Sequence, residues 1–349
     1  MRTQPQPEPL DRIWDDENVI PAELGPDTEF LFDRMTRDTM EAVGACPGAR
    51  VLDVGCGRGL DLASLAGHGA ILMGCDPSGV MVRRARETLE KRGLKPLVVC
   101  CSAENLPFLP ESFDRVYCKG AIDHFYDPSR ALREMTRVLR PGGRLVVSVA
   151  NFESLGCRLG RLYNRLHRIF TGRELPRPHF WEIPKDHVYR FHRELLLGMM
   201  PGGARVVNLW GISLFWGFPG WGGILRRTPR GARKLLLDVV DRVGRVFPSL
   251  ADVMVLRARK EGRAEASRQL EAAAERVTRG VDMNRNCRIQ GALICGGTVV
   301  VALLFLIGLL VKSYWALAIP VAIGFLWLLG LAFWIGWTLL TIRVEPPRE

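Results

Sequence analysis

The sequence of 349 residues predicts an α/β protein with a doubly wound sheet, followed by a hairpin of two transmembrane helices. Three observations carry this prediction: strands and helices alternate through the first half, a glycine-rich turn joins the first strand to its helix, and two long stretches near the C-terminus lack charge. A hydrophobic fraction of 48% and a charged fraction of 24% exclude a disordered chain.

The net charge of +11 is distributed unevenly. Residues 1–150 carry a net charge of −3, residues 151–290 of +13 and residues 291–349 of +1. Such a basic middle segment favours polyanionic partners, either nucleic acid or an anionic membrane surface. The 9 cysteines form no Cys-x-x-Cys pair, which argues against a disulfide framework or a zinc site and indicates a reducing, cytosol-facing environment.

The first half begins with a predicted N-terminal helical cap over residues 1–45. An apolar strand from Arg50 to Val54 follows, then glycines at 55, 57 and 59, then a helical pattern that starts at Leu60. A second strand, Ala70 to Cys75, leads into Asp76, whose carboxylate can accept hydrogen bonds from ribose hydroxyls. This arrangement predicts a nucleotide-like cofactor at the edge of a parallel sheet.

The spacing argues against a dinucleotide. A Gly-x-Gly-x-x-Gly fingerprint requires glycine at the position of Leu60, and the last glycine instead comes one residue early. Asp53 lies inside the first strand, where its charge is unfavourable for a pyrophosphate and favourable for a cationic aminoacyl group. The ligand is therefore expected to be positively charged.

Five ordered blocks resemble the class I S-adenosylmethionine-dependent methyltransferases, and within them the group similar to the ubiquinone and menaquinone biosynthesis enzymes. The blocks are VLDVGCGRG at 51–59, GCDPS at 74–78, SAENLPF at 102–108, FDRVYCKGAIDHF at 113–125 and LREMTRVLRPGGRL at 132–145. The resemblance implies a Rossmann-like, seven-stranded methyltransferase sheet over residues 46–260 and S-adenosyl-L-methionine as the cofactor. It implies these cofactor-binding residues: Asp53, Gly55, Cys56, Gly57, Gly59, Asp76, Pro77, Ser102, Ala103, Glu104 and Lys119.

Within that resemblance, the glycine-rich turn and Asp53 hold the methionine part of the cofactor, Asp76 holds the ribose, and the loop of Ala103 and Glu104 lies against the adenine. The family usually has aspartate at the position of Ser102, which weakens or rebuilds the expected adenine contact.

The later strands and helices follow from local patterns. Asp127 is predicted to cap a helix that begins at Pro128 and buries Leu132, Met135 and Leu139, and Arg140-Pro-Gly-Gly143 is predicted to end it. A fifth strand is expected from Arg144 to Val149. The family resemblance places the last two strands at Arg205–Leu214 and Asp252–Arg259.

Residues 152–250 are predicted to contain a basic and aromatic lid and insertion. In residues 155–169 leucines recur at spacings of 3 and 4, and a stripe of arginines flanks them. Two interpretations stay open: a helix embedded in a membrane surface, or a lid helix whose leucines pack on the domain core. Residues 209–234 combine tryptophans and phenylalanines with arginines, which fits an interfacial dock or the stacking of nucleic-acid bases.

The histidines include one candidate base. His124 follows the fourth strand, near the expected position of the methyl group, and is predicted to act as a catalytic base together with Asp123. His187 and His192 are interpreted as structural. No histidine has metal-ligand spacing with a partner, so no metal is expected.

The C-terminal part is predicted to be a helical linker over 261–290 and two transmembrane helices within 291–342. Residues 292–311 are uncharged, and 314–342 again carry no charge, with aromatic residues near both ends of the second stretch. Arginines flank both outer ends of the hairpin, and only Lys312 lies in its turn. The catalytic domain and both termini are therefore expected on the cytoplasmic side, without a signal peptide.

Together these patterns predict a membrane-anchored methyltransferase that acts on a lipophilic small molecule, such as a quinone precursor, an isoprenoid or another lipid. Anchoring would raise the effective concentration of such an acceptor. Two alternatives remain: a nucleic-acid methyltransferase that uses the basic middle segment, and a non-catalytic membrane scaffold that binds S-adenosylmethionine.

Overall fold

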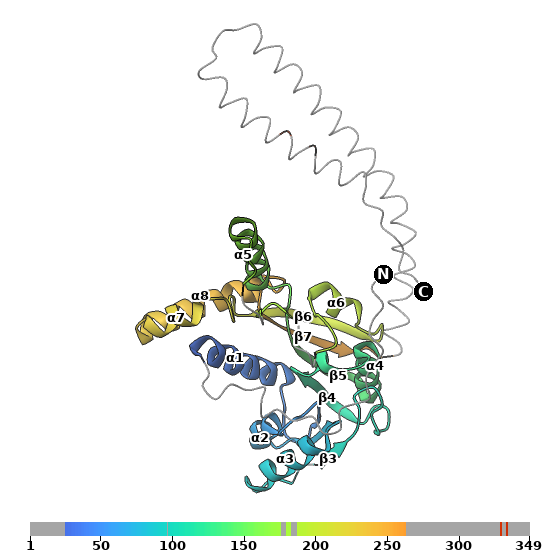
Figure 1. The fold of residues 1–349 in the computed structure, drawn as a ribbon. Helices are drawn as coiled ribbons and strands as arrows, with labels where there is room; N and C mark the ends of the chain where they lie inside the picture. The colour runs from blue at the N-terminus through green and yellow to red at the C-terminus, as the bar shows by residue number, and fades with distance from the viewer. Residues whose placement is uncertain are drawn as a thin grey trace, which may run out of the picture. The chain divides into compact units, whose positions relative to one another are not determined.

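The structure is a computed structural model of the chain, and it describes residues 25–95, 97–175, 179–182, 187–262, 329 and 333. The chain divides into two compact units, Met1–Arg263 and Ala264–Glu349. All of the helices and strands given below belong to the first unit (Figure 1).

In the described part of the chain, no helix is both long enough and apolar enough to cross a membrane. The predicted hairpin over 291–342 and the linker over 261–290 lie outside the described residues, apart from single positions. Of the predicted N-terminal cap, residues 1–24 also lie outside them.

The described part of the first unit contains a seven-stranded sheet, as the sequence predicted, in the order β3-β2-β1-β4-β5-β7-β6. The strands are β1 Arg50–Val54, β2 Ile71–Asp76, β3 Leu97–Cys100, β4 Phe113–Lys119, β5 Leu139–Ala150, β6 Ala204–Ile212 and β7 Val253–Lys260. The first five strands pair in parallel, while β7 runs antiparallel to both β5 and β6. Because the chain moves outward in opposite directions from β1 and β4, the carboxyl ends of these two strands border the crevice where such sheets bind ligands.

Helices cover both faces of this sheet because alternate strand residues bury opposite faces. One core joins Leu52 and Val54 to Leu132 of α4 (Pro128–Val138) and Leu196 of α6 (Arg193–Gly198). The other joins Val51 to α1, α2 and α3. The remaining helical elements are α1 Pro26–Val43, α2 Leu60–Leu65, α3 Gly79–Glu90, α5 Leu155–Thr171, α7 Trp221–Arg227 and α8 Arg230–Val246, with the 3₁₀ turns η1 Ala66–His68 and η2 Ile122–His124.

The start of α4 was predicted correctly, but its end was not. The Asp127 side chain accepts a hydrogen bond from the Arg130 N–H at 2.8 Å, which confirms the cap. The helix ends at Val138, however, and β5 begins at Leu139, which was predicted to belong to the helix; the strand also includes residues 140–143, which were predicted to separate the helix from the strand. Leu139 pairs with Phe113 before the register shifts, so the strand absorbs the Pro-Gly-Gly residues as an irregularity in its ladder.

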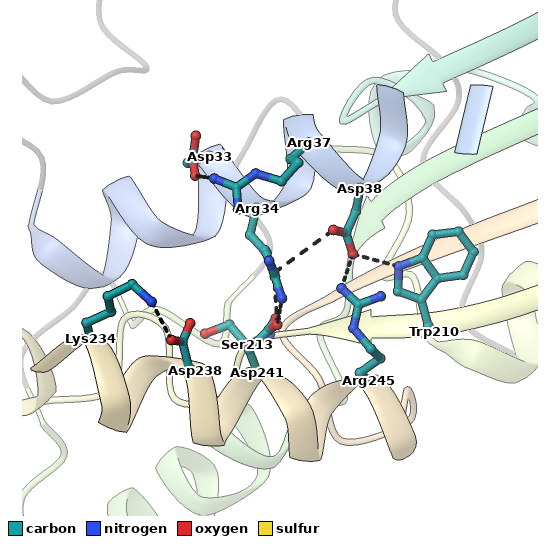
Figure 2. Close-up of polar contacts among 10 residues, drawn as sticks. All are labelled: Asp33, Arg34, Arg37, Asp38, Trp210, Ser213, Lys234, Asp238, Asp241 and Arg245. Atoms are coloured by element: carbon teal, nitrogen blue, oxygen red, sulfur yellow. Dashed lines mark hydrogen bonds and ion pairs between the residues drawn. The ribbon is translucent and has the colours of Figure 1, made fainter. Parts of the chain in front are cut away.

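A polar network joins α1 to α8 and β6 (Figure 2). Nε and Nη2 of Arg34 donate to Oδ2 of Asp241 at 2.9 and 2.7 Å, and Oδ1 of Asp241 accepts from the Ser213 N–H at 3.2 Å. Asp38 of α1 accepts from Arg245 at 2.5 Å and from the Trp210 indole at 2.9 Å. These contacts fix the N-terminal helix against elements from the far end of the unit.

The helix α5 confirms the predicted helix over residues 155–169 and tests one of its two interpretations, the lid helix. Its packed face is made of small residues, and a Cβ on Gly160 would lie 2.4 Å from the Trp181 ring. Leu159, Leu162 and Leu166 are 38, 51 and 42% exposed. The lid interpretation, in which these leucines pack on the domain core, is therefore wrong, because glycines let the helix approach its neighbours on another face.

Candidate active site

The glycine-rich turn between β1 and α2 requires glycine for two physical reasons. Gly55, Gly57 and Gly59 have φ of 78°, 47° and 71°, a region that L side chains rarely adopt. A Cβ on Gly55 would also lie 2.5 Å from the Cβ of Ala121, so the turn closely approaches the residues that follow β4. The N–H groups of Gly55 and Cys56 both donate to the Cys75 carbonyl, at 2.8 and 2.9 Å.

Asp53 lies beneath this turn and is 2% exposed. Burial raises the pKa of its carboxyl well above the ordinary value, the charge of Asp61 adds to the rise, and the Tyr117 hydroxyl and the Lys119 ammonium oppose it. Its Oδ2 atom is buried without a hydrogen-bond partner among the described residues. A cation bound at the turn would compensate the negative charge of the ionised Asp53 carboxylate.

Asp76 ends β2 and connects the turn to α3. Its Oδ2 accepts from the Gly57 N–H at 3.0 Å, and its Oδ1 accepts from the Ser78 N–H at 2.9 Å. Because a carboxylate has about four lone-pair positions, these bonds are compatible with further hydrogen bonds from ribose hydroxyls. Pro77 follows, and its carbonyl accepts from the Cys100 thiol at 3.4 Å.

The loop predicted to face the adenine is held by its own polar contacts. The Ser102 hydroxyl bonds to Glu104 Oε2, and Glu104 Oε1 accepts from the N–H groups of Tyr126 and Asp127 at 2.8 and 3.1 Å. Ala103 is buried in the core. In this structure Glu104 therefore ties its loop to the start of α4, a function that its position in the motif did not indicate.

Lys119, at the end of β4, also has partners within the domain. Its Nζ donates to the Thr36 hydroxyl at 2.7 Å and to Asp61 Oδ1 at 2.8 Å, so it links β4 to α1 and α2. Its charge acts on the neighbouring carboxyl of Asp53, where it lowers the pKa. In the described structure, Lys119 thus acts on the glycine-rich turn through its charge, which lowers the pKa of Asp53.

Asp123 and His124 occupy the short turn η2 directly after β4, next to the glycine-rich turn. Asp123 is 3% exposed, and its Oδ2 lies 3.1 Å from Nδ1 of His187. The rings of His124 and His187 meet edge to face, with centroids 4.3 Å apart. The sequence predicted a pair of Asp123 and His124, and it did not predict that His187 lies beside them.

Asp123, His124 and His187 each offer one ligand atom within 4.8 Å of the others, so the group has the composition of a cation site. Spacing along the sequence does not reveal this group, because His187 comes from a segment far from η2. The only local signal for it was the density of histidines in HVYRFH at 187–192.

The turn and its acids fit S-adenosylmethionine on two observations. The close approach at Gly55 forms a cradle that a Cβ would fill, and Asp53 presents a buried carboxylate oxygen that needs a positive partner. When bound, S-adenosylmethionine supplies an electrophilic methyl group on a sulfonium. Asp53 and the turn would hold its cationic part, and Asp76 its ribose.

Comparison with known proteins supports this assignment. Residues 52–147 match a family model described as a methyltransferase domain. The methyltransferase GfsG of Streptomyces halstedii is 39% identical over 119 residues, which are 33% of this chain and 43% of that protein. The O-methyltransferase rstn1 of Aspergillus nomiae is 31% identical over 166 residues, which are 47% of this chain and 71% of that protein.

The ubiquinone biosynthesis O-methyltransferase of Coxiella burnetii is 36% identical over 104 residues, which are 30% of this chain and 44% of that enzyme. Except for rstn1, the chain thus spans less than half of the length of these relatives. The match to rstn1 extends over most of that protein, and the matched blocks contain the turn and the acids described above. The chain therefore belongs to the class I S-adenosylmethionine-dependent methyltransferases.

Proposed function

We propose that this protein is a membrane-anchored methyltransferase whose acceptor is a lipophilic small molecule, such as a quinone precursor, an isoprenoid or another lipid. The observation that carries the proposal is the exposed apolar face of α5. Ile169 and Phe170 are 64 and 83% exposed, in addition to the leucines described above. Large apolar side chains gathered along one helix face are typical of surfaces that contact a membrane or an apolar partner.

The charges next to this face favour an anionic membrane. Arg158, Arg161 and Arg190 all lie within 4.0 Å of Glu153, so three cations share one carboxylate. Arg168 contacts Glu174 at 3.3 Å and is 59% exposed. The surface keeps an excess of positive charge, which lipid phosphates would compensate.

Two further facts support the proposal. The uncharged stretches at 292–311 and 314–342 are each long enough to span a bilayer as a helix. One relative acts, by its name, in ubiquinone biosynthesis. A membrane-anchored enzyme meets lipophilic acceptors at a high effective concentration, which reduces the cost of bringing the reactants together.

The test uses the full chain reconstituted in lipid nanodiscs, with radiolabelled S-adenosylmethionine and either a total lipid extract or a soluble metabolite extract. We expect label in the organic phase, lost in Asp76→Ala and kept in the exposed control variant Asp33→Ala. Label only in the aqueous phase would refute the lipophilic acceptor. Binding of S-adenosylmethionine without labelling of any fraction would favour the non-catalytic scaffold.

A second comparison isolates α5. The double variant Leu162→Ser and Phe170→Ser should raise the KM for the lipid-phase acceptor and leave the affinity for S-adenosylmethionine unchanged. Val246→Ser is the matched control because Val246 is an exposed apolar residue of α8, 69% accessible. An unchanged KM in the α5 variant would contradict the role assigned to this face.

The nucleic-acid alternative receives less support from the aromatic residues of the 209–234 segment. The Trp210 indole donates to Asp38 at 2.9 Å, and the Trp216 indole donates to Thr28 at 3.2 Å. Both rings are thus tied to α1 by their polar edges. RNA or DNA binding with a steep decrease as salt concentration rises would nevertheless favour that alternative.

A further inference from the structure

Four adjacent strands of the sheet each contribute one arginine to a row that crosses it, the arginine row. Arg115 of β4 is the register partner of Arg144 of β5. Arg144 is also the partner of Arg259 of β7, which in turn pairs with Arg205 of β6. Register partners point to the same face of a sheet, and neighbouring strands lie about 4.8 Å apart, so the row spans about 14 Å. Because side chains alternate along a strand, Arg257 of β7 lies on this face as well.

The described surroundings of the row leave much of its positive charge unbalanced. Burial lowers the pKa of Arg144, and the charges of Arg115, Arg257 and Arg259 lower it further. Within the described part of the chain, no carboxylate oxygen lies within 4.0 Å of these four guanidinium groups. The groups therefore repel one another without an acid between them.

Two acids beside these strands contact other arginines. Asp114 lies 2.8 Å from Arg140, and Glu261 lies 3.8 Å from Arg205 at the end of the row. Arg115 also keeps an unused donor: its Nη1 donates to the Asp114 carbonyl at 2.9 Å, but its Nε is buried without a hydrogen-bond partner among the described residues. A buried donor without an acceptor destabilises a fold, so an acceptor is missing here.

One structural contact offsets part of the charge. Gly44 ends α1, and a Cβ on Gly44 would lie 2.5 Å from Nη1 of Arg144, so this guanidinium lies against the end of the helix. The C-terminal carbonyls of a helix carry about half a negative charge, which balances part of one guanidinium. Like charges directly opposite on adjacent strands are destabilising, so the row as a whole lowers the stability of the sheet. A bound anion would reverse this effect.

The row lies away from the edge of the sheet that carries the glycine-rich turn. The strands β1, β4 and β5 run parallel, and the turn follows the carboxyl end of β1. From Arg144 the strand β5 continues to Ala150 at its carboxyl end, a rise of about 20 Å. A ligand at the row is therefore a molecule other than S-adenosylmethionine, whatever acceptor the enzyme methylates.

The chemistry of the row favours phosphate. The planar fork of a guanidinium pairs with a phosphate group through two parallel N–H···O bonds, and a carboxylate pairs in the same way but brings only one charge. One phosphate monoester carries at most about two negative charges, which cannot balance four guanidinium groups. We propose that Arg115, Arg144, Arg257 and Arg259 form a binding site for a compact anion with several phosphate groups, either a free oligophosphate or the phosphorylated headgroup of a lipid.

Nucleic acid also carries phosphates, but the row lacks the other part of a single-strand site. Such sites combine cations with exposed aromatic side chains on which the bases stack. The aromatic residues of the four strands that carry the row are Phe113, Tyr117 and Trp210, and they are buried or half-buried. A row of about 14 Å also fits a compact anion better than an extended strand.

The experiment titrates sodium tripolyphosphate into the full chain in dodecyl maltoside and follows binding by calorimetry. We expect saturable binding that weakens as the salt concentration rises. The double variant Arg144→Gln and Arg259→Gln, the row variant, should weaken binding by about 100-fold, because each change removes hydrogen bonds to a charged group, which are typically worth tenfold or more. The matched control is Arg83→Gln with Arg92→Gln, which removes the same charge from exposed positions on and after α3 and should leave the affinity unchanged.

A second titration, with mixed micelles of dodecyl maltoside and phosphatidylinositol bisphosphate, separates the two sources of phosphate. Tripolyphosphate binding that the row variant loses supports a free oligophosphate, and micelle binding alone that the row variant loses supports a lipid headgroup. If neither probe binds the wild type, or if the α3 control weakens binding as much as the row variant does, the proposal is overturned. A single-stranded RNA that depends on the row and binds more tightly than both probes would overturn it in favour of nucleic acid.

Urea unfolding gives a readout that a purely structural role would not produce. Because the row variant relieves repulsion, its midpoint without ligand should equal or exceed that of the wild type, and tripolyphosphate should raise only the wild-type midpoint. A lower midpoint of the row variant without ligand would mean that these arginines serve the fold, and it would contradict the site. The affinity of the row variant for S-adenosylmethionine should be unchanged, so a failure of this site and a failure of the proposed methyl transfer are measured separately.

Discussion

Replacing Asp241 by alanine should destabilise the first unit by about 3 kcal/mol, the lower end of the range for breaking a buried ion pair. Asp241 is fully buried, and its partner Arg34 is 24% exposed. The change leaves the guanidinium of Arg34 and the N–H of Ser213 without the acceptor that each now has. We choose the lower end because water can reach part of Arg34.

The matched control is Asp33→Ala on the same helix. Asp33 and Arg37 form an exposed pair, with side chains 68 and 59% accessible, so this change should cost less than about 0.5 kcal/mol. The measurement is urea unfolding of the detergent-solubilised full chain, followed by tryptophan fluorescence. A cost below about 1 kcal/mol for Asp241→Ala would refute the reasoning that burial makes this pair expensive to break.

A double variant tests the same argument from the opposite direction. Arg34→Met with Asp241→Leu removes both charges together, so no buried charge is left unpaired. Replacing a whole buried pair by apolar side chains is often close to neutral. We therefore expect the double variant to recover most of the stability that Asp241→Ala loses, and a double variant as unstable as the single one would contradict this account.

Three further predictions concern pH and the glycine-rich turn. Burial raises the pKa of Asp252 to about 7, so the contribution of its protonated form to stability is present below about pH 4 and is lost as the pH rises to about 7. Relative to the Asp252→Asn variant, the wild type should therefore lose about 4 kcal/mol of unfolding free energy across this window. Stability curves of the two proteins that run parallel with pH would refute this prediction. Gly55→Ala should abolish S-adenosylmethionine binding and destabilise the fold more than the control Gly48→Ala. Both glycines have positive φ, but only at Gly55 would the added Cβ clash with a neighbouring side chain. Equal urea midpoints for the two variants would count against this. Because burial raises the pKa of Asp53, binding of the cationic donor should release a proton and tighten as the pH rises, and calorimetric heats that are independent of buffer ionisation would contradict this.

The parts of the site that the sequence predicted are those built from contiguous residues. The strand Arg50–Val54 was predicted with the bounds that the structure has, and the glycines after it do adopt positive φ. Asp53 and Asp76 lie at the turn because each is attached to a strand whose carboxyl end must reach the same edge of a parallel sheet. The contacts of Lys119 and Glu104 could not be predicted from local sequence, because their partners, Thr36 and Tyr126, belong to other segments of the chain.

Local sequence by itself therefore determined the order of strands and helices, the glycine-rich turn and the kind of cofactor, because hydrophobic period and backbone strain act within a few residues. Only the tertiary structure decided that Asp123 faces His187, that Arg34 meets Asp241, and that the leucines of α5 remain exposed. Each of these depends on which distant segments pack together. A periodic apolar face has the same pattern in sequence whether the core or an external partner covers it, so packing alone could distinguish the two.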